Sequence, residues 1–347
     1  MLLEPDTLEL LERAPALLEL LPDDGRFKLE MPASQLELLT SARGDVPAAV
    51  ADLRACRRTL LDAVDGLARP AAAGAHPFSA AEGALNPGSR HAHTAGEYGL
   101  VARRQLVCAL QVHVAVGGAE RTLAVYNELR EHLPLLAALA ANAPLYGGRD
   151  TGLASVRPKI AELLPRQGVP PALNGWEELE RELRWGAEAG TVPGPSAWWW
   201  ELRPHLRYGT LELRVPDAQT TLADAGAIAA LTQALVAWLA ERHDAGARDS
   251  PVPTWRIEEN RWSACRHGVE CAFADLRSGA RRPARECLRS LIDRLEPYAE
   301  RLGAADALQH ARCLVERNGA LRQRAVAAET GARGVTDWLA RQFEHGV

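Results

Sequence analysis

The chain has 347 residues, 47% hydrophobic and 24% charged, which is ordinary for a soluble globular protein and excludes large-scale disorder. Its formal net charge of -5 at pH 7 gives no positive excess to neutralise phosphate backbones or anionic lipids. We therefore expect small-molecule partners, with no nucleic acid and no membrane among them. The sequence leaves open whether the chain forms a homo-oligomer.

The N-terminal part alternates apolar and charged residues in two short segments. The segment Phe27 to Met31 places Lys28 and Glu30 opposite its apolar residues, and Glu37 lies between two leucines shortly afterwards. This alternation is typical of strands with one buried face. A helix is predicted next, over Pro47 to Leu67, from its helical periodicity.

A third strand is predicted over Gln105 to Val114, where alternate positions differ in chemistry. Its apolar face carries Leu106, Cys108, Leu110, Val112 and Val114, and its polar face carries Gln105, Gln111 and His113. The position of Cys108 on the apolar face indicates a core residue rather than a nucleophile. A helix follows over Ala119 to Ala141, with a predicted kink at Pro134.

The segments Trp200 to His205 and Thr210 to Val215, joined by a short turn at Tyr208 and Gly209, are typical of a β-hairpin. Their polar positions are Glu201, Arg203, His205, Glu212 and Arg214. Helices packed on one face of the sheet, with charge on the other, are the implied arrangement.

The remaining helices are predicted over Leu222 to Ala240 and over much of Ala284 to Phe343. The stretches Ala71 to Gly88, Pro165 to Asn174 and Gly190 to Pro195 are rich in glycine and proline and are expected to be loops. None has the length or composition of an interdomain linker, and no internal repeat is visible. We therefore predict one domain over residues 1–347.

Three features of the sequence bear on its cellular location. The start, Met1 to Pro5, lacks a basic flank followed by an apolar core, and Thr232 and Gln233 interrupt the apolar stretch Ala225 to Ala240. The six cysteines are scattered without a CxxC spacing, which indicates reduced, buried thiols. We predict a cytoplasmic protein without a membrane span.

The polar face of the predicted sheet contains both signs of charge on adjacent strands. A solvated face is the ordinary interpretation of such alternation, but the mixture of histidine, glutamine, glutamate and arginine favours a functional, concave face. Glu37, Glu212 and His113, with Glu30 as a fourth candidate, would form an oxygen-rich site suited to Mg²⁺ or Mn²⁺.

Two arginines of this face, Arg203 and Arg214, would stabilise charge on a transferring phosphoryl group. For any one of the charged residues taken alone, a surface or intra-sheet ion pair is the alternative. The sequence contains no G-x-x-x-x-G-K-[ST] and no strand-linked G-x-G-x-x-G, which argues against a P-loop or Rossmann nucleotide site. It also lacks H-E-x-x-H and G-x-S-x-G, the signatures of zincin proteases and α/β-hydrolases.

Five stretches together carry a family resemblance that extends over nearly the whole chain. They are Gly74-Ala75-His76-Pro77-Phe78, Gln111-Val112-His113-Val114, Gly148-Arg149-Asp150-Thr151-Gly152, Trp198 to Thr220 (WWWELRPHLRYGTLELRVPDAQT) and Asn260 to Gly268 (NRWSACRHG). In content and order they closely resemble the carboxylate–amine ligase branch of the glutamate–cysteine ligase type 2 family. The tryptophan-rich block is the most specific of the five.

The resemblance implies an α/β fold in which an antiparallel sheet forms an open half-barrel, with helices packed on its convex face. This is the catalytic fold shared by glutamine synthetases and guanido kinases. ATP and Mg²⁺, or Mn²⁺, would bind on the concave side. By analogy, the enzyme would phosphorylate the γ-carboxylate of glutamate to an acyl phosphate, and the amine of cysteine, or another amine, would then displace the phosphate.

The resemblance also implies roles for single residues. Position by position, Glu37, His113 and Glu212 resemble metal ligands, with Glu30 a further candidate, and Arg203 and Arg214 resemble phosphate or carboxylate contacts. The matching residues Arg149, Asp150 and Arg157 have no assigned role, and a loop-ordering ion pair is the alternative for them.

One departure from the family pattern opens a second hypothesis. Relatives begin with a strand of the form Gly-Val-Glu-x-Glu, whose glutamates bind metal, whereas this sequence starts at Met1-Leu2-Leu3-Glu4-Pro5-Asp6. We expect the reading frame upstream of Met1 to encode that strand. The alternative is a catalytically impaired homologue that binds nucleotide or amino acid without turnover. A metal-dependent hydrolase that uses Glu37, His113 and Glu212 ranks last.

Overall fold

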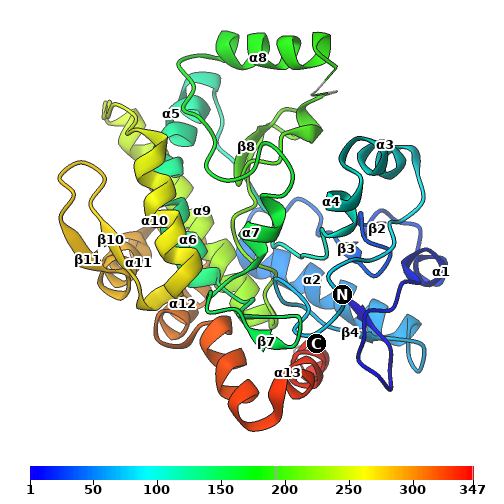
Figure 1. Cartoon of the computed structure of the whole chain (residues 1–347). Helices are drawn as coiled ribbons and strands as arrows, with labels where there is room; N and C mark the ends of the chain where they lie inside the picture. The colour runs from blue at the N-terminus through cyan, green and yellow to red at the C-terminus, as the bar shows by residue number, and fades with distance from the viewer. Residues whose placement is uncertain (191, 193, 346) are drawn as a thin grey trace.

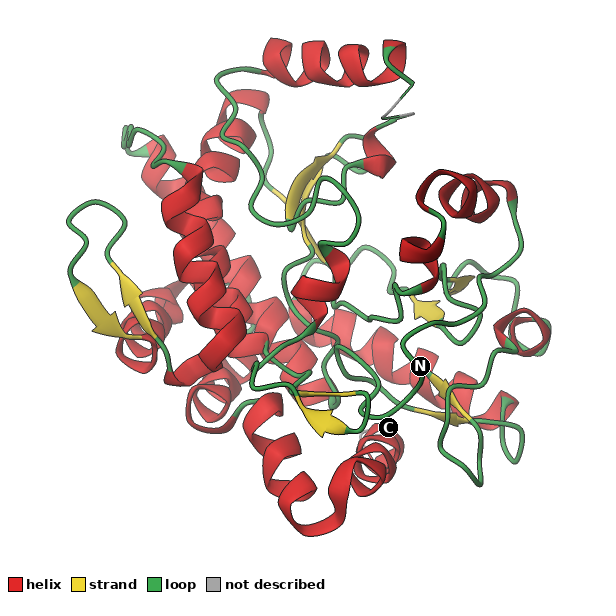
Figure 2. Ribbon diagram, in the orientation of Figure 1, coloured by secondary structure: helices red, strands yellow, loops and turns green. Residues whose placement is uncertain are grey.

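The computed structural model describes residues 1–190, 192, 194–345 and 347. Helices and several small antiparallel sheets make up the structure (Figures 1 and 2), which confirms the predicted mixed α/β class. The α-helices are α1 (Ala14–Leu18), α2 (Val46–Ala63), α3 (Ser89–Tyr98), α4 (Leu100–Arg103), α5 (Ala119–Leu129), α6 (Leu133–Ala140), α7 (Arg157–Ala161), α8 (Trp176–Glu188), α9 (Leu222–Asp244), α10 (Thr254–His267), α11 (Ala284–Arg301), α12 (Ala305–Arg317) and α13 (Gly319–His345).

Short 3₁₀ turns and strands connect these helices. The 3₁₀ turns are η1 (Arg130–His132), η2 (Pro195–Ala197) and η3 (Gly268–Glu270). The strands are β1 (Leu2–Leu3), β2 (Phe27–Leu29), β3 (Leu36–Leu38), β4 (Arg69–Pro70), β5 (Val112–Ala115), β6 (Leu145–Tyr146), β7 (Arg149–Asp150), β8 (Leu202–His205), β9 (Thr210–Leu213), β10 (Ala272–Ala274) and β11 (Arg281–Pro283).

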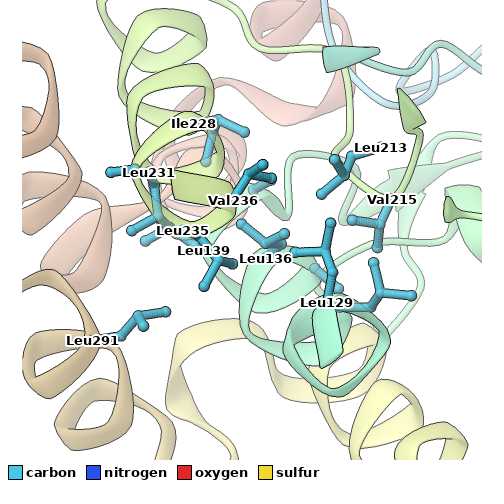
Figure 3. Close-up of a cluster of buried hydrophobic side chains, with 14 of the residues drawn as sticks. Leu129, Leu136, Leu139, Leu213, Val215, Ile228, Leu231, Leu235, Val236 and Leu291 are labelled. Atoms are coloured by element: carbon cyan, nitrogen blue, oxygen red, sulfur yellow. The ribbon is translucent and has the colours of Figure 1, made fainter. Parts of the chain in front are cut away.

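Helix α9 runs through the main hydrophobic core. It begins after Thr221, whose side-chain oxygen accepts a hydrogen bond from the backbone N–H of Asp224, a common N-terminal cap. Its apolar side chains pack with those of α5, α6, α11 and α12, and Figure 3 shows Ile228, Leu231 and Leu235 among them. The helix is long and apolar enough to cross a membrane, but 72% of its most apolar stretch is buried inside the protein. We therefore interpret α9 as a core helix.

The four predicted helical regions are confirmed, with shifted boundaries. Helix α2 ends at Ala63 rather than Leu67, and the helix predicted over Ala119 to Ala141 divides at η1 into α5 and α6. Pro134 lies in the first turn of α6. The N–H groups of a first turn have no partner within the helix, so a proline there costs no helical hydrogen bond. The last region divides into α11, α12 and α13.

The predicted loops also agree with the structure as far as it describes them. Residues 165–174 contain neither helix nor strand, and residues 71–88 contain only isolated β-bridges. Residues 191 and 193 of the third loop lie outside the described residues. Each of the six cysteines is free, so none of them forms a disulfide.

The sheet that carries most of the candidate residues has the strand order β5-β9-β8, all antiparallel. Strands β8 and β9 form the predicted hairpin, and Gly209 in its turn has a φ of 64°, a conformation that favours glycine. The strand predicted over Gln105 to Val114 is regular only from Val112 onward. Strands β2 and β3 form a separate hairpin, with Lys28 opposite Glu37.

Backbone contacts outside the regular strands link neighbouring sheets. The N–H of Leu2 donates to the carbonyl of Ser34 at 2.9 Å, and isolated bridges join Ala75 to Val107 and Ala109 to Asp217. These contacts are compatible with one curved sheet, but the half-barrel shape stays a prediction. The organisation as one domain over residues 1–347 stays a prediction as well.

Candidate functional site

Glu212 lies at the centre of the polar face. In the antiparallel register of β5, β9 and β8, Glu212 is opposite His113 on one side and opposite Arg203 on the other. Residues directly opposite each other on neighbouring strands project from the same face of a sheet. The structure therefore brings together three of the residues that the sequence predicted to share a site.

The Glu212 carboxylate is held by two guanidinium groups. Arg203 donates to it twice, from Nε to Oε2 at 2.7 Å and from Nη2 to Oε1 at 3.2 Å, and Nη1 of Arg214 also contacts Oε1. Only 1% of the Glu212 side chain is exposed. Burial alone would raise the pKa of Glu212, but the two arginines outweigh it and lower the pKa to about 2.

A second group of carboxylates comes from the β2–β3 hairpin. Burial raises the pKa of Glu37 to about 7, with a further contribution from the negative charge of Glu30, while Lys28 and Arg214 oppose the rise. The charge of Glu212 also acts on Glu37. The two hairpins therefore bring their carboxylates within electrostatic range of one another.

The donor set fits a hard divalent cation in its chemistry. Glu30 and Glu37 repel each other, and oxygen ligands are those that Mg²⁺ and Mn²⁺ prefer. Within the described ranges, however, no three side chains of histidine, cysteine, aspartate or glutamate are grouped closely enough to hold one ion. Glu212 is engaged by arginines, so its part in a metal site needs a rearrangement of these contacts. The predicted metal ligands stay a prediction.

His113 occupies the edge of this group. Its Nε2 is 4.0 Å from Oε2 of Glu212, and its Nδ1 is hydrogen-bonded to the hydroxyl of Thr210 at 3.0 Å. Burial lowers the pKa of His113, although Glu212 opposes the shift. The rings of His205 and Tyr208 stack on each other with centroids 4.3 Å apart, and both contact the His113 ring edge-on. His205 therefore joins the polar face, as predicted.

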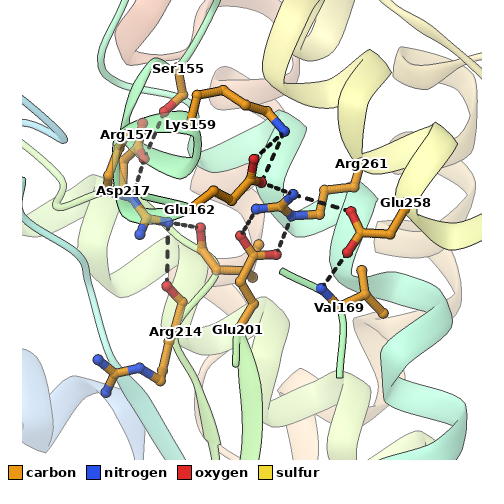
Figure 4. Close-up of polar contacts among 11 residues, drawn as sticks. Ser155, Arg157, Lys159, Glu162, Val169, Glu201, Arg214, Asp217, Glu258 and Arg261 are labelled. Atoms are coloured by element: carbon orange, nitrogen blue, oxygen red, sulfur yellow. Dashed lines mark hydrogen bonds and ion pairs between the residues drawn. The ribbon is translucent and has the colours of Figure 1, made fainter. Parts of the chain in front are cut away.

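Asp217 is a buried anchor beside the sheet that the alternation of the strands does not predict. Its carboxylate accepts hydrogen bonds from Arg157 Nε at 2.7 Å, Ser155 Oγ at 2.9 Å and the backbone N–H of Asn142 at 2.6 Å. Figure 4 shows Ser155 and Arg157 converging on it. A side chain at Gly74 would come within 2.7 Å of the Asp217 carboxyl carbon, which explains the glycine in that motif. Arg157 thus has a structural ion-pair role.

The prediction that Glu201 belongs to the polar face is wrong. Its carboxylate is buried and forms a paired contact with Arg261 of α10, at 2.7 Å to both Nε and Nη2 (Figure 4). Glu201 precedes β8, where the alternation of a regular strand does not yet apply. Gln105 is misplaced for the same reason, since it precedes β5 and donates instead to the buried carbonyl of Ile160 at 3.0 Å.

Two other motif residues tie the chain together. Asp150 accepts hydrogen bonds from Arg324 at 2.8 and 3.0 Å, so it forms the loop-ordering ion pair that was the alternative for this motif. Arg149 is exposed. His76 contacts the carbonyl of Leu8 through Nε2 at 2.8 Å and accepts two backbone N–H groups at Nδ1. Burial lowers the pKa of His76 to about 4, which favours the neutral ring.

Comparison with known proteins identifies the family. The family model described as glutamate-cysteine ligase family 2 (GCS2) matches residues 6–344. This chain belongs to that family. A Rubrobacter xylanophilus protein named "Putative glutamate--cysteine ligase 2-3" is 40% identical over 91% of this chain and 86% of its own length. A Thermobifida fusca protein named "Putative glutamate--cysteine ligase 2" is 32% identical over 100% of this chain and 89% of its own length. The predicted resemblance is confirmed.

Solved structures support the fold of this GCS2 protein. A glutamate–cysteine ligase from Francisella tularensis, solved in complex with AMP, superposes with a TM-score of 0.70 at 12% identity and covers 93% of this chain and 82% of its own. A bifunctional glutathione synthetase from Pasteurella multocida gives a TM-score of 0.64 at 14% identity, over 92% of this chain and 48% of its own. At these identities the likeness concerns the fold alone.

Proposed function

We propose that this GCS2 protein is an ATP-dependent carboxylate–amine ligase that joins the γ-carboxylate of glutamate to the amine of cysteine or of another small molecule. Family membership supports the reaction class. The observation that carries the proposal is Glu212, which holds Arg203 and Arg214 on one face beside the carboxylates of the β2–β3 hairpin. That combination suits a triphosphate and the cations that accompany it.

The reaction has two displacements. A γ-carboxylate oxygen of glutamate attacks the terminal phosphorus of ATP, the bond to ADP breaks, and an acyl phosphate forms. The amine nitrogen then attacks the acyl carbon, the bond to phosphate breaks, and the nitrogen loses a proton. Arg203 and Arg214 contact the transferring phosphoryl group, and Glu212 fixes both guanidinium groups because its oxygens accept from each.

The acidic residues have a separate role in this scheme. Glu37 and Glu30, with His113 and Glu212, would hold Mg²⁺ or Mn²⁺, which neutralises phosphate charge when bound. Burial, and after it the negative charge of Glu30, raises the pKa of Glu37, and a bound cation would offset that repulsion. We propose small-molecule substrates and a cytoplasmic location as part of the same function.

The test is a screen for ADP release with Mg-ATP and pairs of amino acids. We expect ADP to form only when a divalent cation, an acid and an amine are all present. ADP that forms from ATP alone would contradict the ligase assignment, because the first displacement needs a carboxylate acceptor. Mass analysis of the product then identifies the acid and the amine.

A catalytically impaired homologue is the second candidate. The contacts of both Glu212 oxygens with arginines favour it, because a metal would have to compete with Arg203 and Arg214 for this carboxylate. Such a homologue would bind Mg-ATP in a calorimetric titration and release no ADP with any amino-acid pair. Turnover with any pair would exclude it.

A further inference from the structure

Arg166 has a backbone conformation that residues with a side chain rarely adopt. Its φ is 58°, in the left-handed region, and among the described residues only Leu8 shares a positive φ without being glycine. Such a conformation is unfavourable and persists where the surroundings hold it, often at functional sites. Arg166 is therefore a candidate for a functional role.

The Arg166 side chain joins two segments that are distant in the sequence. Its Nη2 donates to the hydroxyl of Tyr98, the last residue of α3, at 2.9 Å, and its Nε donates to the carbonyl of Ala197 at 3.1 Å. Its guanidinium carbon also lies 5.2 Å from the centre of the Trp199 ring, which Tyr98 contacts edge-on at 5.7 Å. Arg166 thus ties α3 to the segment that precedes β8.

That segment carries an acceptor for Arg203. The carbonyl of Trp198, between the two residues that Arg166 contacts, accepts a hydrogen bond from Nη1 of Arg203 at 2.7 Å. The Nε and Nη2 atoms of Arg203 are held by Glu212. The plane of the Arg203 guanidinium is therefore fixed from two sides, by Glu212 in the neighbouring strand and by the backbone that Arg166 anchors.

We propose that Arg166 is a positioning residue of the ligase site, which acts by fixing the Trp198 carbonyl and through it Arg203. The inference rests on the proposed function, in which Arg203 contacts the transferring phosphoryl group. Small displacements of such a group are costly, since stabilisation of developing charge depends on donors already in place. Glycine would suit the backbone of position 166 without strain, but it would supply none of the three contacts.

Three variants separate positioning from stability. Arg166→Gly removes the contacts and relieves the backbone, Arg166→Ala removes the same contacts and keeps the unfavourable φ, and Tyr98→Phe removes one hydrogen bond while it keeps the ring. We expect kcat for ADP release to fall about tenfold in both Arg166 variants and less in Tyr98→Phe, with KM for the amine unchanged. Thermal stability should fall more in Arg166→Ala than in Arg166→Gly.

The matched control is Arg256→Ala. Arg256 also lies over an indole, 5.7 Å from the ring of Trp255, and also donates to a carbonyl, that of Leu276 at 2.8 Å, but contacts no candidate residue in these interactions. Its kcat should equal that of the wild type. A wild-type kcat in Arg166→Gly, or losses of kcat that follow thermal stability across the variants, would overturn the positioning role.

Hydrogen exchange without substrates tests positioning independently of turnover. Backbone amides of residues 197–203 should exchange faster in Arg166→Gly than in the wild type and the Arg256→Ala control. Unchanged exchange there would refute the inference even if the enzyme is active. Absence of ADP release by the wild type with every amino-acid pair would instead refute the proposed function, and the exchange result would still decide whether Arg166 holds this segment.

Discussion

Replacement of Glu201 by glutamine should strongly destabilise the fold, because Glu201 is one partner of a buried ion pair. The Arg261 side chain is 2% exposed and the Glu201 side chain 6%, and two contacts of 2.7 Å join them. Removal of one partner from such a pair leaves a charge that is desolvated and no longer balanced, which costs about 3–5 kcal/mol.

The remaining partners of Arg261 set the expected size of the effect. Glu162 at 2.5 Å and Glu258 at 3.2 Å still contact Nη1 in Glu201→Gln, and their side chains are 32% and 37% exposed. Because these two carboxylates still balance part of the Arg261 charge, we expect the loss of stability to lie at the lower end of that range, about 3 kcal/mol. Among the described residues, no further carboxylate pairs with Arg261 at the Nε and Nη2 atoms that Glu201 binds.

Urea unfolding followed by tryptophan fluorescence and circular dichroism measures this loss. The control is Glu180→Gln, which removes a partner of Arg184 in a pair more than 60% exposed on both sides, where we expect at most about 1 kcal/mol. A double replacement by Leu at 201 and Met at 261 should recover much of the stability, because it leaves no buried charge at either position. A change below about 1 kcal/mol in Glu201→Gln, at unchanged m-value, would refute the reasoning.

Three further predictions concern the site and its support. Glu212→Gln should abolish cation-dependent ADP release, because it removes the carboxylate that holds Arg203 and Arg214; full activity at subsaturating Mg²⁺ would contradict this. Arg214→Lys should lower kcat at least about tenfold despite its conserved charge, and near-wild-type kinetics would show that Arg214 is only an ion-pair partner. Asp224 is buried, which raises its pKa, but His310 and Arg322 outweigh burial and lower it. The stabilisation by ionised Asp224 is therefore present above its ordinary pKa of 3.8 and is lost as the pH falls below that value. In Asp224→Asn the thermal stability should depend less on pH in this acidic range. An unchanged pH dependence of thermal stability would contradict the prediction.

The polar face could be predicted where the strands are regular. His113, Arg203 and Glu212 lie within β5, β8 and β9, and the two-residue period of a strand was enough to place them on one face. The same period fails for Glu201 and Gln105, which precede their strands by one residue or more. Strand boundaries depend on backbone pairing with distant segments, and a single sequence does not specify that pairing.

Helices outside the predicted regions bury few apolar side chains or bury polar side chains beside them. Helix α8 is exposed along most of its length, with Leu179 and Gly186 as its buried residues. Helix α10 buries Asn260 and Arg261 together with apolar residues, so its inner face looks polar in the sequence. Periodicity of apolar residues detects helices that pack on a hydrophobic core and misses those that bury hydrogen-bonded polar groups.

The backbone of Arg214 is held by contacts that the alternation of apolar and polar residues does not predict. Its backbone N–H donates to the carbonyl of Glu201 at 2.7 Å, and its own carbonyl accepts from Nη2 of Arg157 at 3.3 Å (Figure 4). Glu201 is bound to Arg261 and Arg157 to Asp217, so two separate buried ion pairs hold the backbone of Arg214 from either side. The alternation of the strand predicts which face the Arg214 side chain occupies. The two ion pairs fix the backbone position from which that side chain extends. A planar guanidinium donates well only when its backbone is held in place. The residues that hold the backbone of Arg214 therefore contribute to the preorganisation of the site, as Arg214 itself does.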